Sequence, residues 1–204
     1  MNFSELARAR RSIRGYDTAQ PMSDADLKAI FDDVVLSPSS FNLQHWTFVV
    51  VRDEANRKAL RDAAMGQQQV ENCAAVVVVC GKLNAHEDID VIYARTPDDV
   101  RERVRGVGGM IYAQNEQMRR DEAVRGSSMA AMTLMYSAKA HGFDTGPMIG
   151  FDPRRVSELL HLPDNLIPTM MIVMGKGSEE PYPRGHRHPL CDVVKLETYD
   201  GTGI

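Results

Sequence analysis

The sequence predicts one domain that mixes α-helices with a buried β-sheet. Residues 76–80 and 170–174 are short apolar runs, which are typical of central strands covered on both faces. Residues 128–141 carry a single charge, Lys139, and a helix that is apolar on nearly every side is a buried one. Because 204 residues suit one domain better than two, we expect a single mixed α/β domain over residues 1–204.

The elements before the first buried run follow from caps and periodicity. Ser4 is a candidate N-cap for a first helix that runs to about Arg10. A capping-box pattern at Ser23 and Asp26 begins a second helix, whose apolar residues recur with helical spacing. Residues 47–51 are β-branched and aromatic, so they predict a strand.

The later elements are bounded in the same way. Asp53 is the expected cap of a third helix. Residues 85–125 are charged and contain three glycines near their middle, so we expect helices and loops packed over the body. Gly142 suits the residue after the buried helix, and Asp152 with Pro153 suits the start of another.

Overall charge and hydropathy limit the classes of partner that we expect. A formal net charge of −4 disfavours nucleic acids and anionic membranes, which reward a basic surface. No apolar run approaches the roughly 20 residues of a membrane helix, and the N-terminus lacks the apolar core of a secretory signal. We therefore expect a cytoplasmic protein with no nucleic-acid and no membrane partner.

Cysteines and histidines give no sign of a metal site. The three cysteines form no C-x-x-C pair and leave an odd count, which fits a reducing compartment. His186 and His188 are the only close histidine pair, and a structural or surface role suits them better than metal binding. No Ser-His-Asp or Cys-His arrangement is convincing either, which suits a protein that needs no nucleophilic side chain.

A group of basic residues near the N-terminus has two interpretations. Arg10, Arg11, Ser12 and Arg14 could surround a phosphate, because guanidinium groups donate paired hydrogen bonds to its oxygens. They could equally be the basic end of a helix, where the helix dipole favours cations. This segment alone leaves both interpretations open.

Three further segments could bind a flat polar ligand or could simply be connections. The loop at 37–46 carries hydroxyls, amides and the only tryptophan. The amides of 67–69 could pair with a heterocycle or face water. At 146–150, glycine and proline could bring backbone N–H groups close to a ligand.

Together and in this order, these segments resemble the FMN-dependent nitroreductase family over nearly the whole chain. The longer strings are most similar to the branch of NAD(P)H nitroreductases linked to quinone reduction. The resemblance is carried by R-R-S-I-R at 10–14, S-P-S-S-F-N-L-Q-H-W at 37–46, G-Q-Q-Q-V at 66–70, D-E-A at 121–123, A-A-M-T-L-M at 130–135, G-F-D-T-G-P-M-I-G-F-D-P at 142–153 and R-G-H-R-H-P at 184–189.

The resemblance implies an architecture that the residues alone do not. It implies an α+β fold with three α/β/α layers around a mixed, largely antiparallel sheet. It also implies an intertwined homodimer with two FMN sites at the subunit interface. In that dimer, 85–125 would form a lid and 180–204 a tail that reaches the partner subunit.

The resemblance also implies which residues bind FMN. The phosphate would be held near the N-terminus and closed from the tail, and the partner would supply the loop at 38–42. Gln67 or Gln69 would face the pyrimidine edge, and the backbone after Pro147 would reach flavin N5 and O4. The full implied set is Arg10, Arg11, Ser12, Arg14, Pro38, Ser39, Ser40, Asn42, Gln67, Gln69, Pro147, Met148, Ile149, Gly150, Arg184 and Arg187.

Three positions depart from the family pattern. Several relatives carry an acidic residue where Ile149 stands, and Pro is common where this chain has His45. Some relatives have a Lys at the position of Gly185, for which Arg184 is a candidate substitute.

The implied activity is transfer of hydride from NAD(P)H through flavin N5 to a quinone, a nitroaromatic compound or a similar small oxidant. A single pocket would serve both substrates, giving ping-pong kinetics. The alternative is a flavin-binding protein that stores FMN or senses redox state without turnover, because a fold does not fix a function.

Overall fold

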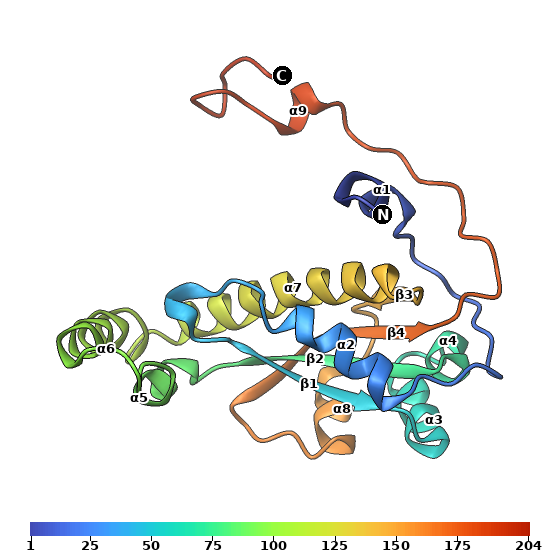
Figure 1. Ribbon diagram of the computed structural model, residues 1–204, viewed down its shortest axis with the longest axis horizontal. Helices are drawn as coiled ribbons and strands as arrows, with labels where there is room; N and C mark the ends of the chain where they lie inside the picture. Colours follow the sequence, from blue (N-terminus) through green and yellow to red (C-terminus); the bar gives the residue numbers. More distant parts are fainter.

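A computed structural model describes residues 1–204 as three layers around a four-stranded antiparallel sheet (Figure 1). The strand order is β1-β2-β4-β3, and each neighbouring pair is antiparallel. The strands are β1 (Trp46–Val51), β2 (Ala75–Lys82), β3 (Asp144–Met148) and β4 (Leu166–Gly175). The sheet is therefore wholly antiparallel rather than mixed, and its one parallel contact is an isolated bridge between Ser12 and Thr145.

Helices cover both faces of the sheet, as expected for three layers. Alternate residues of β2 point to opposite sides, so Val76 and Val78 join one core and Val77 and Val79 join the other. The first core packs against α3 (Glu54–Ala63), α4 (Gln68–Asn72) and α8 (Pro153–Leu159). The second packs against α2 (Asp24–Val34) and α7 (Glu116–Ala140). This double burial explains why β2 is apolar throughout.

Most of the predicted caps are present. Ser23 and Asp26 form the capping box of α2, Asp53 caps α3, and Asp152 caps α8 ahead of a proline. Gly142 follows the end of α7 with a φ of 80°, a conformation in which glycine avoids a Cβ clash.

The first helix starts and ends earlier than predicted. Helix α1 (Phe3–Ala9) is capped by Asn2, whose side chain accepts from the N–H of Glu5. Glu5 in turn accepts from the N–H of Asn2, so the capping box begins two residues before Ser4. Arg10 lies beyond the helix in extended backbone.

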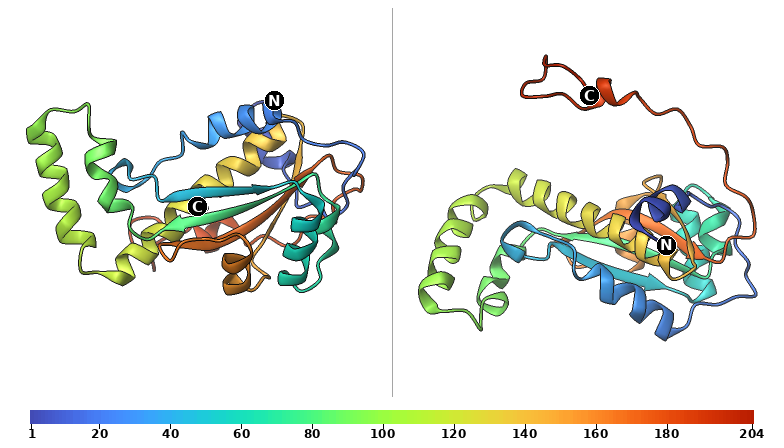
Figure 2. Two further views of the ribbon diagram at one scale, coloured as in Figure 1. Left: turned by 90° about the horizontal axis from the view of Figure 1, so that it is seen from below. Right: turned by 45° about the horizontal axis from the view of Figure 1, so that its top comes forward.

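The segment expected to pack over the body instead projects from it. The 3₁₀ turn η2 (Ala85–Asp88), α5 (Ile89–Ile92) and α6 (Asp98–Tyr112) form an arm at one end of the molecule (Figures 1 and 2). The glycines at 106–109 lie inside α6, and α7 begins at Glu116 rather than near 128. A small core around Leu43, Ala85, Ile89 and Tyr112 attaches the arm to the body.

The C-terminal tail leaves the body after β4 (Figure 2). Residues 178–204 contain one short helix, α9 (Leu190–Val193), and are almost entirely exposed. Exposed large apolar side chains recur along this tail at Tyr182, Leu190, Val193, Leu196, Tyr199 and Ile204. No helix anywhere in the chain combines the length and apolar character needed to cross a membrane.

Candidate functional site

The basic N-terminal segment runs along the edge of the sheet. Ser12 forms a parallel bridge with Thr145 of β3, and the N–H of Ile13 donates to the carbonyl of Thr145 at 3.0 Å. A Cβ added to Gly146 would lie 2.7 Å from the carbonyl oxygen of Ile13. Glycine at this position of β3 therefore permits the close approach of the basic segment.

The start of the tail lies against the same segment. Arg11 donates to the carbonyl of Tyr182, and the guanidinium of Arg14 lies 5.0 Å from the centre of the Tyr182 ring. Arg184 donates to the carbonyl of Arg8 at 2.9 Å. The tail thus brings its arginines to those of the N-terminus, although about 170 residues separate them in sequence.

These arginines are close enough to repel one another. The pKa of Arg10 is lowered mainly by burial; Tyr136 opposes this shift, and the positive charges of Arg184, Arg11 and Arg187 add to it. No carboxylate forms an ion pair with any of the four, nor with Arg14, although twelve ion pairs occur elsewhere in the chain. The cluster therefore carries an uncompensated positive charge, which suits an anion.

The predicted glutamines and the backbone after β3 come together. Gln67 Nε2 donates to the carbonyl of Gly150 at 2.9 Å, and Gln69 Nε2 donates to Gln67 Oε1 at 3.1 Å. Gln69 Nε2 also lies 3.7 Å from the sulfur of Met148. The segment expected to be a turn is in part strand, since Pro147 and Met148 belong to β3, where proline is tolerated because β3 is an edge strand.

Two adjacent backbone donors remain free beside these glutamines. No hydrogen bond within the chain uses the N–H of Ile149 or that of Gly150. A Cβ on Gly150 would lie 3.3 Å from Gln67 Nε2, so a side chain there would press on the amide that fixes this backbone. The pair of N–H groups is available to an external acceptor.

Two exposed apolar side chains flank this backbone, and one was not predicted. Ile149 is 79% exposed and Met65 is 80% exposed. Met65 has a φ of 57°, which is unfavourable for a residue with a Cβ, and its sulfur lies 4.0 Å from the Cβ position of Gly150. The Met-Gly pair after α3 was a local signal for such a turn, but it does not say where the methionine points.

A hollow of about 520 Å³ connects the arginine segment with the glutamine segment. Both segments contribute to its wall, and the start of the tail closes it. Its lining is Arg14, Gly15, Tyr16, Thr18, Gln68, Gln69, Asn72, Ser178 and Glu179.

The polar loop at 37–46 lies at the opposite end of the sheet. It leads into Trp46 at the start of β1, and Trp46 pairs with Gly81 at the end of β2. The basic segment instead contacts Thr145, which pairs with Met174 of β4, and Met174 pairs with Ala75 at the start of β2. The loop therefore sits at the base of the arm, far along the sheet from α1 (Figures 1 and 2). A single chain does not bring Pro38, Ser39, Ser40 and Asn42 to the arginine cluster.

The loop is held in a conformation that its residues do not favour. Within the 3₁₀ turn η1 (Ser40–Asn42) and just after it, three residues other than glycine have positive φ: 50° at Phe41, 53° at Asn42 and 50° at Gln44. The hydroxyl of Ser39 accepts from the N–H of Gln44 at 2.9 Å.

Neither buried cysteine is an activated nucleophile. Burial raises the pKa of Cys73 to about 11 and that of Cys80 to about 12, so both thiols are protonated at neutral pH. Burial lowers the pKa of His45 to about 4, and its Nδ1 has no hydrogen-bond partner. His186 and His188 stack edge to face on the exposed tail.

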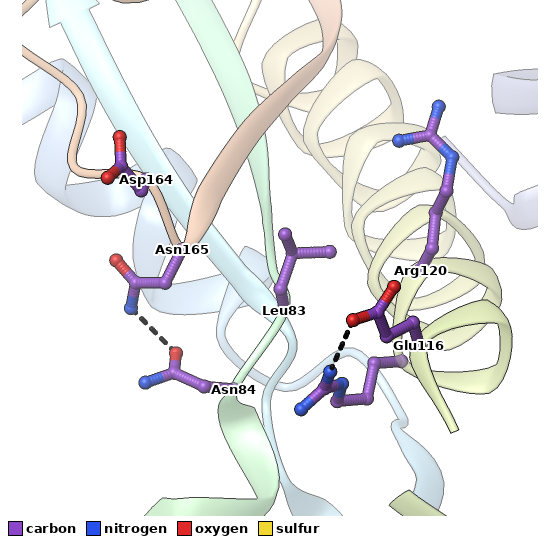
Figure 3. Close-up of a pocket in the computed structure, with 7 residues that line it drawn as sticks. Leu83, Asn84, Glu116, Arg120, Asp164 and Asn165 are labelled. Carbon is purple, nitrogen blue, oxygen red and sulfur yellow. Dashed lines mark hydrogen bonds and ion pairs between the residues drawn. The ribbon is translucent and has the colours of Figure 1, made fainter. Parts of the chain in front are cut away.

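A second hollow, of about 510 Å³, lies at the start of α7 (Figure 3). Asn165 donates to Asn84 at 2.6 Å, and Arg119 lies 3.9 Å from Glu116. None of the predicted cofactor-binding residues contributes to it. Its charges are of both signs and partly neutralise one another, unlike those of the arginine cluster.

Comparison with known proteins identifies the family. Residues 7–176 match the model of the Nitroreductase family. A relative from Bacillus subtilis, named "Putative NAD(P)H nitroreductase MhqN", is 36% identical over 95% of this chain and 98% of its own. A Thermus thermophilus relative named "NADH dehydrogenase" is 37% identical over 95% of both chains.

Solved structures agree with the sequence relatives. A crystal structure from Bacillus subtilis superposes with a TM-score of 0.91, at 36% identity over 95% of this chain and 98% of that one. A structure from Exiguobacterium sibiricum, solved in complex with FMN, superposes with a TM-score of 0.90, at 32% identity over 97% and 98%. The chain described here therefore belongs to the nitroreductase family of oxidoreductases.

Proposed function

We propose that this chain is an FMN-dependent oxidoreductase that passes hydride from NAD(P)H to a small oxidised acceptor, a quinone or a nitroaromatic compound. FMN as the cofactor agrees with the family and with the FMN complex of the Exiguobacterium sibiricum relative. The observation that carries the proposal is the arginine cluster without ion pairs, together with two free backbone donors at 149–150. A hollow lined by Arg14 and Gln69 connects the basic segment with the glutamines that hold this backbone.

The cationic end of the site fits a terminal phosphate. Arg11, Arg184 and Arg187 each lie within electrostatic reach of Arg10, and none of the four forms an ion pair. A phosphate dianion would relieve this repulsion and accept paired hydrogen bonds from the guanidinium groups. The exposed hydroxyl of Ser12 and the nearby Arg14 are further donors.

The other end of the site fits a heterocycle with acceptors on its edge. The free N–H groups of Ile149 and Gly150 can donate to a ring nitrogen and a ring carbonyl. Gln67 holds this backbone through the carbonyl of Gly150, and the Oε1 atom of Gln69 is free to accept from an imide N–H. Gly150 keeps the approach to this edge open.

We infer that the working form is a homodimer. Residues 38–42 lie at the end of the sheet remote from the arginine cluster, so they reach a flavin held there only from another copy of the chain. The apolar side chains of the tail are exposed along 178–204, and burial against a partner would remove them from water. Both features support an exchange of loops and tails between two subunits.

The chain's residues bind and orient, and the redox chemistry belongs to the cofactor. When bound, FMN supplies a carrier that takes hydride at N5 and passes it on. In the net reaction NAD(P)H and a proton convert a quinone to a hydroquinone and leave NAD(P)⁺. The backbone at 149–150 fixes the reacting edge, and the apolar side chain of Ile149 replaces the carboxylate that some relatives place there.

Steady-state and rapid kinetics test this proposal. NADH or NADPH should bleach the yellow holoenzyme in the absence of an oxidant, and a quinone or a nitroaromatic compound should restore the colour. Because both substrates would use one pocket in turn, double-reciprocal plots at several fixed NAD(P)H concentrations should be parallel. Intersecting lines would contradict the shared pocket, and a flavin that neither nucleotide reduces would favour storage or sensing.

A further inference from the structure

The loop that carries Ser40 and Asn42 is held in place by two tyrosines of the arm. The Tyr112 hydroxyl lies 2.8 Å from Ser40 Oγ, and the Tyr93 hydroxyl donates to the carbonyl of Phe41 at 2.8 Å. Tyr112 ends α6, and Tyr93 follows α5, so the two contacts come from both helices of the arm. One contact holds a side chain of the loop and the other holds its backbone.

The loop needs such support because its backbone is unfavourable. Three residues with a Cβ have left-handed φ between 41 and 44, and such conformations persist where the surrounding structure fixes them. The ring of Phe41 also packs edge to face against that of Tyr112, with centroids 6.3 Å apart. The arm therefore contacts the loop at Phe41, one of the residues whose backbone conformation is unfavourable.

The Tyr112–Ser40 contact has a preferred direction. A phenol is more acidic than an aliphatic alcohol, so the better arrangement has Tyr112 donating and Ser40 Oγ accepting. The proton of Ser40 is then left free for another acceptor. Tyr112 is 2% exposed, so its hydroxyl has no water to turn to in place of Ser40.

We propose that Tyr112, assisted by Tyr93, is a positioning residue for the cofactor: it fixes Ser40 with its proton directed to the FMN of the partner subunit. This inference rests on the proposed function, in which the loop at 38–42 meets the flavin across the dimer. It makes the arm part of the cofactor site. By reciprocity, bound FMN stabilises the attachment of the arm.

A double-mutant cycle on the holoenzyme tests the proposal. The variants are Tyr112→Phe, which removes only the hydroxyl, Ser40→Ala, and the two together. The release rate of FMN is followed by the rise in free-flavin fluorescence after dilution. We expect about tenfold faster release for each single variant, the scale of one lost hydrogen bond, and about the same tenfold for the double variant.

Two controls separate positioning from a general loss of structure. Ser157→Ala removes a hydroxyl that bonds only to the carbonyl of Pro153 within α8, and it should leave release unchanged. Thermal unfolding of the apoprotein reports on folding, so a Tyr112→Phe effect confined to stability would overturn the proposal. Tyr93→Phe should also speed release, because it frees the carbonyl of Phe41.

The outcomes distinguish this inference from the function on which it rests. If Ser40→Ala speeds release but Tyr112→Phe does not, or if the two effects multiply, the positioning role is wrong and the cofactor site stands. If Ser40→Ala itself has no effect, the loop does not meet the flavin, and the dimeric site of the proposed function fails with it.

Discussion

At one end of the sheet, Arg10, Arg11 and Arg184 gather with no carboxylate partner, whereas at the other end Ser40 and Phe41 are held by tyrosine hydroxyls. The first region has an unmet electrostatic requirement, which an anion would satisfy. In the second region the hydrogen bonds are satisfied within the chain, and they fix the position of the loop. Substitutions in the first region should therefore give effects that salt screens, and those in the second should give effects that salt does not change.

The largest effect is expected at Gly150, where the proposed site would bring the backbone closest to the cofactor. Gly150→Val places a branched side chain against Gln67 Nε2, which a Cβ alone would approach to 3.3 Å. We expect kcat/KM to fall by several hundredfold, more than about 3 kcal/mol, which is the scale of losing a preorganised donor. The flavin content of the purified variant should be measured alongside.

Gly109→Val is the matched control, because this glycine faces open space on α6. Its effect should be limited to helix propensity. If Gly150→Val retains both turnover and flavin, the free N–H groups at 149–150 are not the donors that meet the ring.

The region at the base of the arm should respond to acid. His45 is 3% exposed, and burial, aided by the positive form of His86, lowers its pKa from 6.5 to about 4. Below pH 6.5 the unfolded chain takes up a proton that the folded chain refuses until about pH 4. Stability is thus fully present above pH 6.5 and falls by up to about 3 kcal/mol as the pH drops to 4.

Urea unfolding at a series of pH values checks this expectation. His45→Gln removes the titrating group, so its free energy of unfolding should fall less steeply between pH 6.5 and 4 than that of the wild type. Equal slopes would show that the carboxylates, rather than His45, set the acid sensitivity of this end of the molecule.

The arginine cluster should show the screening that the arm lacks. Arg10→Ala should weaken FMN binding by roughly 1.5–3 kcal/mol, the value of a hydrogen bond to a charged group. The penalty should shrink as salt is raised, and Arg103→Ala, which removes an exposed arginine of α6, should be neutral. A salt-independent penalty, or none, would restore the interpretation in which Arg10 only ends a helix.

Local chemistry explains what could be predicted from the sequence. Caps at Ser23, Asp53 and Asp152 act within one helical turn, and the apolar strand β2 (Ala75–Lys82) is buried on both faces, so short windows of sequence contain both signals. The prediction that residues 85–125 pack over the body was wrong, because their charge and glycines indicate an exposed segment but not where it lies relative to the sheet. Its attachment depends on Tyr112 and Leu43, which are far apart in sequence.

The site likewise contains residues that a local sequence pattern predicts and residues that only long-range contacts reveal. The basic segment at 10–14 is visible as a run, but its charge becomes unusual only when the tail adds Arg184, which no local pattern predicts. Met65 was not predicted as a residue of the site, because a single methionine after a helix gives no functional signal. The roles of Tyr93 and Tyr112 likewise arise from contacts across 52 and 72 residues.

The smallest effect is expected at Ile149, an exposed residue of the site. In the proposed site Ile149 would offer its backbone N–H to the ring. Its side chain is 79% exposed and forms no part of either core. Ile149→Ala keeps the N–H, so turnover with a small quinone should stay within about tenfold, less than about 1.4 kcal/mol in the barrier. Ile149→Glu adds a carboxylate, and its negative charge near an apolar ring should raise KM for hydrophobic quinones more than for polar ones. Steady-state kinetics with two quinones that differ only in an alkyl chain measure this difference. If Ile149→Ala abolishes turnover while flavin remains bound, the side chain itself orients the substrate. The site would then depend on an apolar contact as well as on the charge of the arginine cluster and the position of the loop at 38–42.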